Sequence, residues 1–201
     1  KEERDQRLQQ AFAQAEEDGM QPYLIPYGGS NPVGVQGYLQ AIQELQEQAL
    51  KPDWIVLASS SGGTQAGMVL GGKQTGFTGR ILGISVDKLA TELIQTIIAL
   101  ANQTATYLNM GVEITPQDVF VNDAYCQAGY GNLQPAEVEA IQLFARTEGI
   151  LLDPVYTGRA ASGLIDLISQ GFFRRDEAVL FWHTGGIPAL FAEPYASVLL
   201  G

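Results

Sequence analysis

The apolar residues of this chain alternate between two periodicities, and the alternation is typical of strands that are each followed by a helix. Residues 53–59 and 79–87 are nearly continuous apolar runs, the pattern of parallel strands covered on both faces. Elsewhere apolar side chains recur at helical spacing, as Leu8, Phe12 and Ala15 do. The predicted helices cover residues 4–18, 34–50, 63–76, 88–108, 135–149 and 157–171, and the predicted strands cover 53–59, 79–87 and 178–186, with a short strand within 21–30 and an extended segment at 150–156.

Strands and helices that alternate with short turns predict βαβ units, a mostly parallel sheet and a three-layer α/β architecture. Asp87 is the predicted cap of the helix at 88–108, and the irregular residues 109–134 are predicted to form a long functional loop. Ligands of such sheets bind at the carboxyl ends of the strands. Four turns of small residues are predicted there: GGSN at 28–31, SSSGGT at 59–64, PVYTG at 154–158 and HTGG at 183–186.

Composition excludes several classes of protein. The chain has 201 residues, of which 46% are hydrophobic and 16% charged, so it can bury a core. Its net charge of −11 argues against a nucleic-acid or anionic-membrane partner. A single cysteine, Cys126, excludes an internal disulfide and a cysteine metal cluster, and it favours a reducing, cytoplasmic setting. No apolar run reaches the length of a membrane span, and the charged N-terminus does not resemble a signal sequence.

The small residues behind the strand at 53–59 raise the question of an anion site. Residues 58–72 are rich in Gly, Ser and Thr and precede or begin a predicted helix. Successive backbone N–H groups in such a turn converge on one point, and the helix adds the positive end of its dipole. The alternative is a tight strand-to-helix turn, in which Gly supplies the backbone conformation and Ser or Thr caps the helix.

Other candidate chemistry is weak. His183 is the only histidine and no carboxylate flanks it, so we interpret it as a hydrogen-bonded residue at a strand end and predict no metal site. Without a second histidine or a Cys–His neighbourhood, a hydrolase triad is not expected, and Cys126 is interpreted as an inert thiol. The dinucleotide fingerprint GxGxxG after a strand and the P-loop pattern GxxxxGK[ST] are both absent.

Four stretches, taken together and in order, resemble one enzyme family. They are residues 22–41 (PYLIPYGGSNPVGVQGYLQA), 59–67 (SSSGGTQAG), 139–165 (EAIQLFARTEGILLDPVYTGRAASGLI) and 180–191 (LFWHTGGIPALF). These stretches are similar to pyridoxal-phosphate enzymes of the tryptophan-synthase-β fold type (fold type II), in the branch of 1-aminocyclopropane-1-carboxylate deaminase and D-cysteine desulfhydrase. The resemblance covers nearly the whole chain and implies pyridoxal 5′-phosphate as cofactor. It also implies that Ser61, Gly62, Gly63 and Thr64 hold the cofactor phosphate.

Thr157 and Thr184 favour one branch of this family. The deaminases resemble this sequence but carry Glu at the position of Thr157 and Leu at that of Thr184. A carboxylate beside the pyridine nitrogen keeps it protonated and strengthens the electron sink that ring opening needs, whereas a threonine hydroxyl only shares a hydrogen bond. The pair therefore favours β-elimination from D-cysteine to pyruvate, sulfide and ammonia, with Thr184 favoured as the residue that faces the nitrogen. The alternatives are the cyclopropane deaminase, or hydroxyls that only cap turns.

Two tyrosines and one absent lysine complete the comparison. By the resemblance, Tyr130 and Tyr156 are active-site phenols that orient the substrate or pass a proton. The family's Schiff-base lysine lies in a Gly-Asn-Lys segment, which none of the four lysines here (Lys1, Lys51, Lys73 and Lys88) matches. We therefore expect residues 1–201 to be the C-terminal, phosphate-binding part of a fold type II enzyme, inactive alone. Its expected partners are the missing N-terminal polypeptide, a small amino-acid substrate and, by family habit, a second copy. A non-catalytic remnant is the other interpretation.

Overall fold

The computed structural model describes residues 2–199, and its centre is a sheet of four parallel strands in the order β3-β2-β1-β4. The strands are β1 (Trp54–Ser59), β2 (Arg80–Ser85), β3 (Phe120–Asn122) and β4 (Val179–Phe181). The helices are α1 (Glu2–Glu17), α2 (Pro32–Glu47), α3 (Gly63–Thr75), α4 (Ala90–Tyr107), α5 (Pro135–Glu148), α6 (Thr157–Ser169) and α7 (Tyr195–Leu199), with short 3-10 turns at Tyr27–Gly29, Pro116–Asp118 and Ile187–Phe191.

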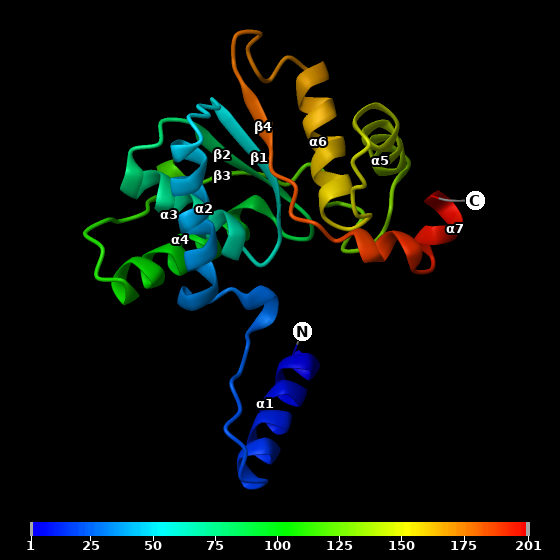
Figure 1. Ribbon diagram of the computed structural model, residues 1–201. Helices are drawn as coiled ribbons and strands as arrows, with labels where there is room; N and C mark the ends of the chain where they lie inside the picture. Colours follow the sequence, from blue (N-terminus) through cyan, green and yellow to red (C-terminus); the bar gives the residue numbers. More distant parts are fainter. Residues whose placement is uncertain (1, 200–201) are drawn as a thin grey trace.

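The sheet is covered on both faces, so the predicted three-layer α/β fold is confirmed (Figure 1). Helices α2, α3 and α4 lie on one side, and α5 and α6 on the other. Strand β1 shows how the two cores form, because successive side chains point to opposite faces. Ile55 and Leu57 join the core under α2–α4, whereas Trp54 and Val56 join the core under α6.

Three local predictions are wrong. Residues 21–30 form no strand, because no described strand lies beside them, and Tyr23 and Ile25 are about two-thirds exposed. The predicted loop at 109–134 contains β3, an edge strand of three residues whose short apolar run gave little signal. Asp87 does not cap α4; the Ala90 N–H donates to Asp123 Oδ2 at 2.7 Å, because the sheet brings the end of β3 beside the start of α4.

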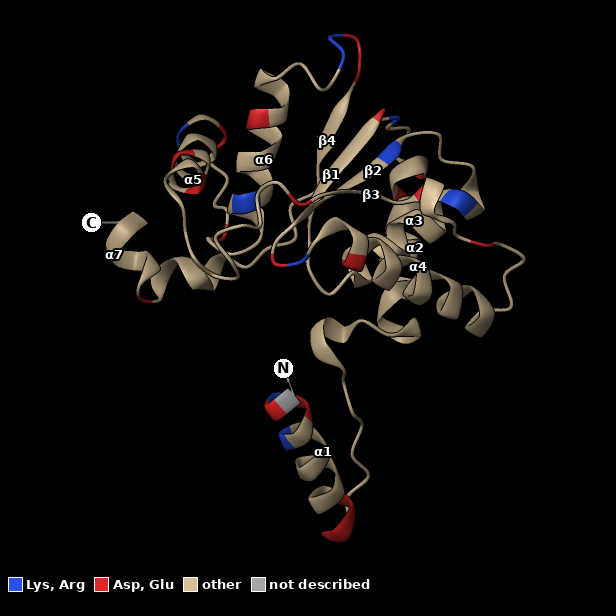
Figure 2. Ribbon diagram, turned by 180° about the vertical axis from the view of Figure 1, so that it is seen from behind, with Lys and Arg blue, Asp and Glu red and all other residues tan. Residues whose placement is uncertain are grey.

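Helix α1 stands apart from the layered body and is joined to it by the extended residues that precede Tyr27–Gly29 (Figure 1). Figure 2 shows that the Lys and Arg residues are few and scattered rather than gathered on one face. None of the helices within residues 2–199 combines the length and the apolar character needed to cross a bilayer.

Asp118 should make stability depend on pH at the N-terminal edge of the sheet. Burial raises the pKa of its carboxyl, but the Lys73 ammonium at 2.6 Å and the Thr115 N–H and hydroxyl at 2.8 Å outweigh it, so the pKa lies below the ordinary 3.8. The resulting stability is complete above pH 3.8 and is lost as pH falls through the native pKa.

We expect Asp118→Asn to cost about 1 kcal/mol of unfolding free energy at neutral pH and almost nothing at a pH low enough to protonate native Asp118. Thermal melts of both proteins across this range measure the difference. Asp176→Asn is the matched control, because that side chain is 78% exposed and its ion-pair partner Arg174 is 72% exposed. A difference in melting temperature that stays constant with pH would contradict the assignment.

Candidate active site

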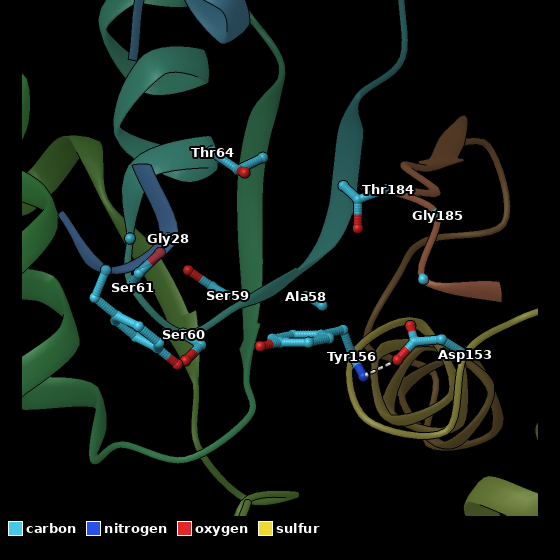
Figure 3. A pocket seen from close by; sticks show the side chains of 13 residues that line it. Gly28, Ala58, Ser59, Ser60, Ser61, Thr64, Asp153, Tyr156, Thr184 and Gly185 are labelled. Carbon is cyan, nitrogen blue, oxygen red and sulfur yellow. Dashed lines mark hydrogen bonds between the residues drawn. The ribbon is translucent and has the colours of Figure 1, made fainter. Parts of the chain in front are cut away.

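A cavity of about 290 Å³ opens at the carboxyl edge of the sheet and is lined by all four predicted turns of small residues (Figure 3). The turns come from segments that are far apart in sequence. They meet because β1 and β4 are neighbours and because the starts of α2, α3 and α6 converge on the strand ends. The lining residues are Tyr27, Gly28, Ala58, Ser59, Ser60, Ser61, Gly62, Thr64, Asp153, Tyr156, Thr184, Gly185 and Gly186.

The N-terminus of α3 faces this cavity without a side-chain cap. Gly62 is the N-cap residue, with φ of +87°, a conformation that glycine adopts without strain. The first N–H groups of a helix have no partner within the helix, and α3 has no side chain at its N-cap to accept from them. Of the alternative, a tight strand-to-helix turn, the structure shows the glycine conformation but not the Ser or Thr cap.

Two glycine turns pack against each other beside this helix end. The Ser30 hydroxyl donates to Ser61 Oγ at 2.8 Å, which joins the turn at 28–31 to the turn at 59–64. A Cβ atom on Gly28 would overlap Ser61 Oγ, and one on Gly63 would lie 2.6 Å from Ser30 Oγ. The contact therefore leaves no room for side chains at either glycine, and backbone forms this wall of the cavity.

Two buried hydroxyls in the cavity wall have no partner among the described residues. Ser59 and Ser60 are 3% and 6% exposed, and neither Oγ atom makes a hydrogen bond. Leaving a hydroxyl buried and unpaired costs roughly 1–3 kcal/mol. A ligand with several oxygen atoms would satisfy these groups.

Asp153 fixes the opposite wall, and its carboxylate is already fully used. Oδ2 accepts from the backbone N–H groups of Val155 and Tyr156, each at 2.8 Å, and Oδ1 accepts from the N–H and the hydroxyl of Thr157, each at 2.7 Å. Asp153 therefore caps α6 and sets the backbone that carries Tyr156. The hydroxyl of Thr157, which is fully buried, also accepts from the Asp153 N–H at 2.8 Å.

Tyr156 and Tyr130 meet through their phenols. Their oxygen atoms are 2.5 Å apart, and the rings are edge to face with centroids 5.8 Å apart. Burial, the hydrogen bond to Tyr130 and the nearby Tyr27 all raise the pKa of Tyr156. Tyr156 is therefore protonated at neutral pH. The pair can share or relay a proton at the cavity.

Thr184 enters from the strand-end turn after β4. Figure 3 shows its hydroxyl on the cavity side, with no hydrogen bond to the other side chains drawn. His183 shapes this turn as expected: the Gly185 N–H donates to His183 Nδ1 at 3.2 Å, so Nε2 carries the ring proton and donates to the Leu151 carbonyl at 3.0 Å. Cys126 does not line the cavity, and burial raises the pKa of its thiol, which fits an inert side chain.

The predicted site residues therefore divide into three groups. Ser61, Gly62, Thr64, Tyr156 and Thr184 line the cavity. Gly63 is the first residue of α3 beside it, and Tyr130 reaches it through Tyr156. Thr157 lies outside the cavity, with its hydroxyl bonded to Asp153, so of the two threonines only Thr184 can face a ligand.

Sequence reasoning missed two lining residues, Tyr27 and Asp153. Gly28, Ser59 and Ser60 were predicted only as members of the small-residue turns at this edge, and they do line the cavity. Asp153 directly precedes the turn at 154–158, and an Asp four residues before a helical Thr is a possible cap. Tyr27 gave no signal, because nothing in its local sequence places it near Tyr156.

Fold and site together define an α/β protein whose cavity, at an uncapped helix N-terminus, fits an anionic ligand, with phenols and a threonine hydroxyl opposite. The chain belongs to the family described as pyridoxal-phosphate dependent enzymes, whose model matches residues 2–185. The pyridoxal phosphate expected from the resemblance is thus the cofactor of its family.

Curated relatives include two D-cysteine desulfhydrases. The Klebsiella pneumoniae (strain 342) protein is 38% identical over 93% of this chain, and the Yersinia enterocolitica protein is 40% identical over 94%. The chain spans 57% of the length of each. Among solved structures, an ACC deaminase homologue matches with a TM-score of 0.84 and 37% identity, over 95% of this chain and 57% of that one. An L-serine ammonia-lyase from Rhizomucor miehei, at 16% identity and TM-score 0.51 over 81% of this chain and 56% of that one, shares the fold.

The residues present fit a phosphate ester. A phosphate monoester accepts hydrogen bonds from convergent N–H groups at a helix N-terminus. The uncapped start of α3 supplies such N–H groups. The unpaired hydroxyls of Ser59 and Ser60 are further donors, and the glycines that tolerate no Cβ keep this wall of the cavity free of side chains. The backbone of Ser61–Thr64 would hold the phosphate, with the Thr64 hydroxyl as a further donor.

Thr64→Val tests this cradle with little change in shape. Loss of one hydrogen bond to a charged group costs about 1.5–3 kcal/mol, so binding of pyridoxamine 5′-phosphate should weaken about tenfold or more. Isothermal titration calorimetry measures the affinity, and pyridoxamine 5′-phosphate is chosen because it forms no Schiff base. Thr78→Val, at an exposed residue outside the cavity, is the control. Equal affinities for Thr64→Val and the control would contradict the role of this hydroxyl.

Proposed function

We propose that this chain is the phosphate-binding part of a pyridoxal-phosphate dependent lyase that catalyses β-elimination from D-cysteine or a related D-amino acid. One observation carries the proposal. Among the described residues that line the cavity, the only carboxylate is Asp153, and its oxygens are bonded to the start of α6. No free carboxylate among these residues is available to the pyridine nitrogen, and we assign that role to the Thr184 hydroxyl, which enters the cavity from the turn after β4.

A hydroxyl at this position suits an elimination better than a ring opening. When bound, pyridoxal phosphate withdraws electrons from the α-carbon of an amino acid. Without a carboxylate to keep the ring nitrogen charged, this sink is weaker, which is sufficient when a thiol leaves from the β-carbon. The reaction converts D-cysteine and water to pyruvate, hydrogen sulfide and ammonia. The two D-cysteine desulfhydrase relatives support this choice.

The chain's own residues have separable tasks in this proposal. The cradle at α3 would anchor the phosphate and so hold the cofactor in the cavity. Thr184 would orient the ring through one hydrogen bond, and Asp153 holds the backbone of Tyr156 at 2.8 Å. Tyr156 and Tyr130 hold a proton between their oxygens, close to where a substrate would lie, and can pass it to or from a reacting group.

No lysine lines this cavity within the described residues, and Lys73 is bonded to Asp118 at the far edge of the sheet. We place the Schiff-base lysine in the part of the relatives' length that this chain does not span. That placement makes catalysis a property of the joined polypeptide. It also defines how the activity must be assayed.

A chimaera gives the test. This chain replaces the segment that it matches in the Klebsiella pneumoniae D-cysteine desulfhydrase, and sulfide and pyruvate are measured with D-cysteine. We expect release of both. Thr184→Leu should lower kcat by about tenfold or more, through the loss of an interaction with the cofactor, whereas Thr184→Ser should retain most of the rate.

If the chimaera releases ammonia from 1-aminocyclopropane-1-carboxylate and no sulfide from D-cysteine, the proposed desulfhydrase activity is wrong and the deaminase activity takes its place. A chimaera that binds the cofactor and releases neither product would favour a non-catalytic remnant. The parent desulfhydrase, assayed in parallel, controls for the reaction conditions.

A further inference from the structure

The loop that carries Tyr130 has no helix or strand of its own. Gly129 and Gly131, on either side of Tyr130, adopt φ values of +84° and +74°, and the Tyr130 side chain is half exposed. A phenol on such a loop would be mobile unless the backbone around it were held. Its oxygen nevertheless lies 2.5 Å from Tyr156, so the loop must be fixed by other contacts.

Arg159 binds this loop on both sides of Tyr130. Its Nη1 donates to the Gly129 carbonyl and its Nη2 to the Asn132 carbonyl, each at 3.0 Å. Nη1 also donates to the Val86 carbonyl, just after β2, at 2.6 Å. The guanidinium is 1% exposed, so these bonds are shielded from competing water.

The position of Arg159 in the chain links it to Tyr156. Both residues lie in the first turn of α6, where Tyr156 is the N-cap and Arg159 is three residues further on. The first turn of α6 therefore carries the Tyr156 phenol and, through Arg159, binds the loop that carries the Tyr130 phenol.

A second side chain binds another carbonyl of this loop. Tyr195 of α7 donates from its hydroxyl to the Gly131 carbonyl at 2.6 Å. With Arg159, three carbonyls among residues 129–132 accept from side chains of α6 and α7. These contacts place both groups where they can restrict Tyr130 without touching a ligand.

We propose that Arg159 and Tyr195 are positioning residues that hold the Tyr130 phenol against Tyr156, and this inference rests on the role given to the two phenols in the proposed function. Arginine suits the task because its planar fork donates to several carbonyls at once, whereas lysine is a single point donor. Tyr195 suits the same task because its long side chain carries a hydroxyl donor from α7, which is remote in sequence, to the Gly131 carbonyl.

The test measures the geometry of the phenols in the chain itself. In deuterated protein with protonated Tyr and Phe rings, the nuclear Overhauser cross-peak between Tyr130 and Tyr156 reports their contact, and Tyr130→Phe and Tyr156→Phe assign it. We expect Tyr195→Phe and Arg159→Lys to lose most of this cross-peak. The peak between Phe144 and Phe181, whose ring centroids are 5.4 Å apart, should remain as an internal control for folding.

Tyr107→Phe is the matched control, because that side chain is 59% exposed on the opposite side of the sheet from α6, and it should leave both cross-peaks unchanged. If Arg159→Lys does not fold, Tyr195→Phe decides alone. An undiminished Tyr130–Tyr156 peak in folded Tyr195→Phe would overturn the inference. Since the measurement needs no cofactor, its failure is distinct from a failure of the chimaera to release sulfide.

Discussion

Replacing Arg159 by methionine is expected to lower the free energy of unfolding by about 3–5 kcal/mol. The substitution leaves Glu137, whose side chain is 4% exposed, as an unpaired buried carboxylate next to the 1%-exposed position of Arg159. It also leaves the Val86, Gly129 and Asn132 carbonyls without their donors. The loss is a large part of the total stability of a domain of this size.

Urea unfolding followed by circular dichroism measures this loss, and a double substitution separates its causes. Glu137→Met with Arg159→Met removes the unpaired charge, so we expect it to recover part of the stability that the single variant loses. Arg174→Met is the control, since Arg174 is 72% exposed beside Asp176 and Glu177 and should cost no more than about 1 kcal/mol. A single variant as stable as the control would show that the buried pair contributes little.

The second large effect is expected at the contact between α2 and α3. A Cβ on Gly67 would lie 2.5 Å from the Val35 carbonyl and 2.7 Å from Tyr38 Cβ, so the two helices must separate to admit it. Gly67→Ala should therefore destabilise the chain by about 1–3 kcal/mol. Because α3 starts at the phosphate cradle, the shift should also weaken pyridoxamine 5′-phosphate binding.

Gly37→Ala is the matched control, because it changes a glycine of the neighbouring helix α2 that has open space around it. Alanine is the better helix former, so this variant should stabilise the chain by about 0.5–1 kcal/mol. The two variants, melted side by side, should thus shift in opposite directions. Equal shifts would mean that the close approach of the helices is not what Gly67 provides.

The predicted architecture follows from local patterns that the structure confirms. Apolar runs long enough for buried strands and helical spacing between them placed β1, β2 and most helices. The two wrong strand predictions share a cause. The segment at 21–30 and β3 are both short, and a short apolar run forms a strand only where another strand lies beside it to accept its hydrogen bonds. For the same reason Asp87 was a plausible cap locally, yet Asp123 takes that role across the sheet.

The candidate site shows the same division. The glycine- and serine-rich turn before α3 is a local feature, and the structure shows it uncapped and facing a cavity. The residues alone could not tell Thr157 from Thr184, although the family resemblance favoured Thr184 as the residue that faces the pyridine nitrogen. The former is bonded to Asp153 within its own turn, and the latter lies across the sheet in the cavity wall.

The sequence by itself determined the layered α/β class, the edge of the sheet where small-residue turns collect, and the family resemblance. These depend on periodicity, on turn residues and on short motifs, which act over a few neighbours in the chain. Tertiary structure alone decided that Asp153 is fully bonded, that Tyr27 lies near Tyr156, and that Arg159 and Tyr195 grip the Tyr130 loop. Such contacts join residues that are distant in sequence, and they form only when packing brings their helices and loops together.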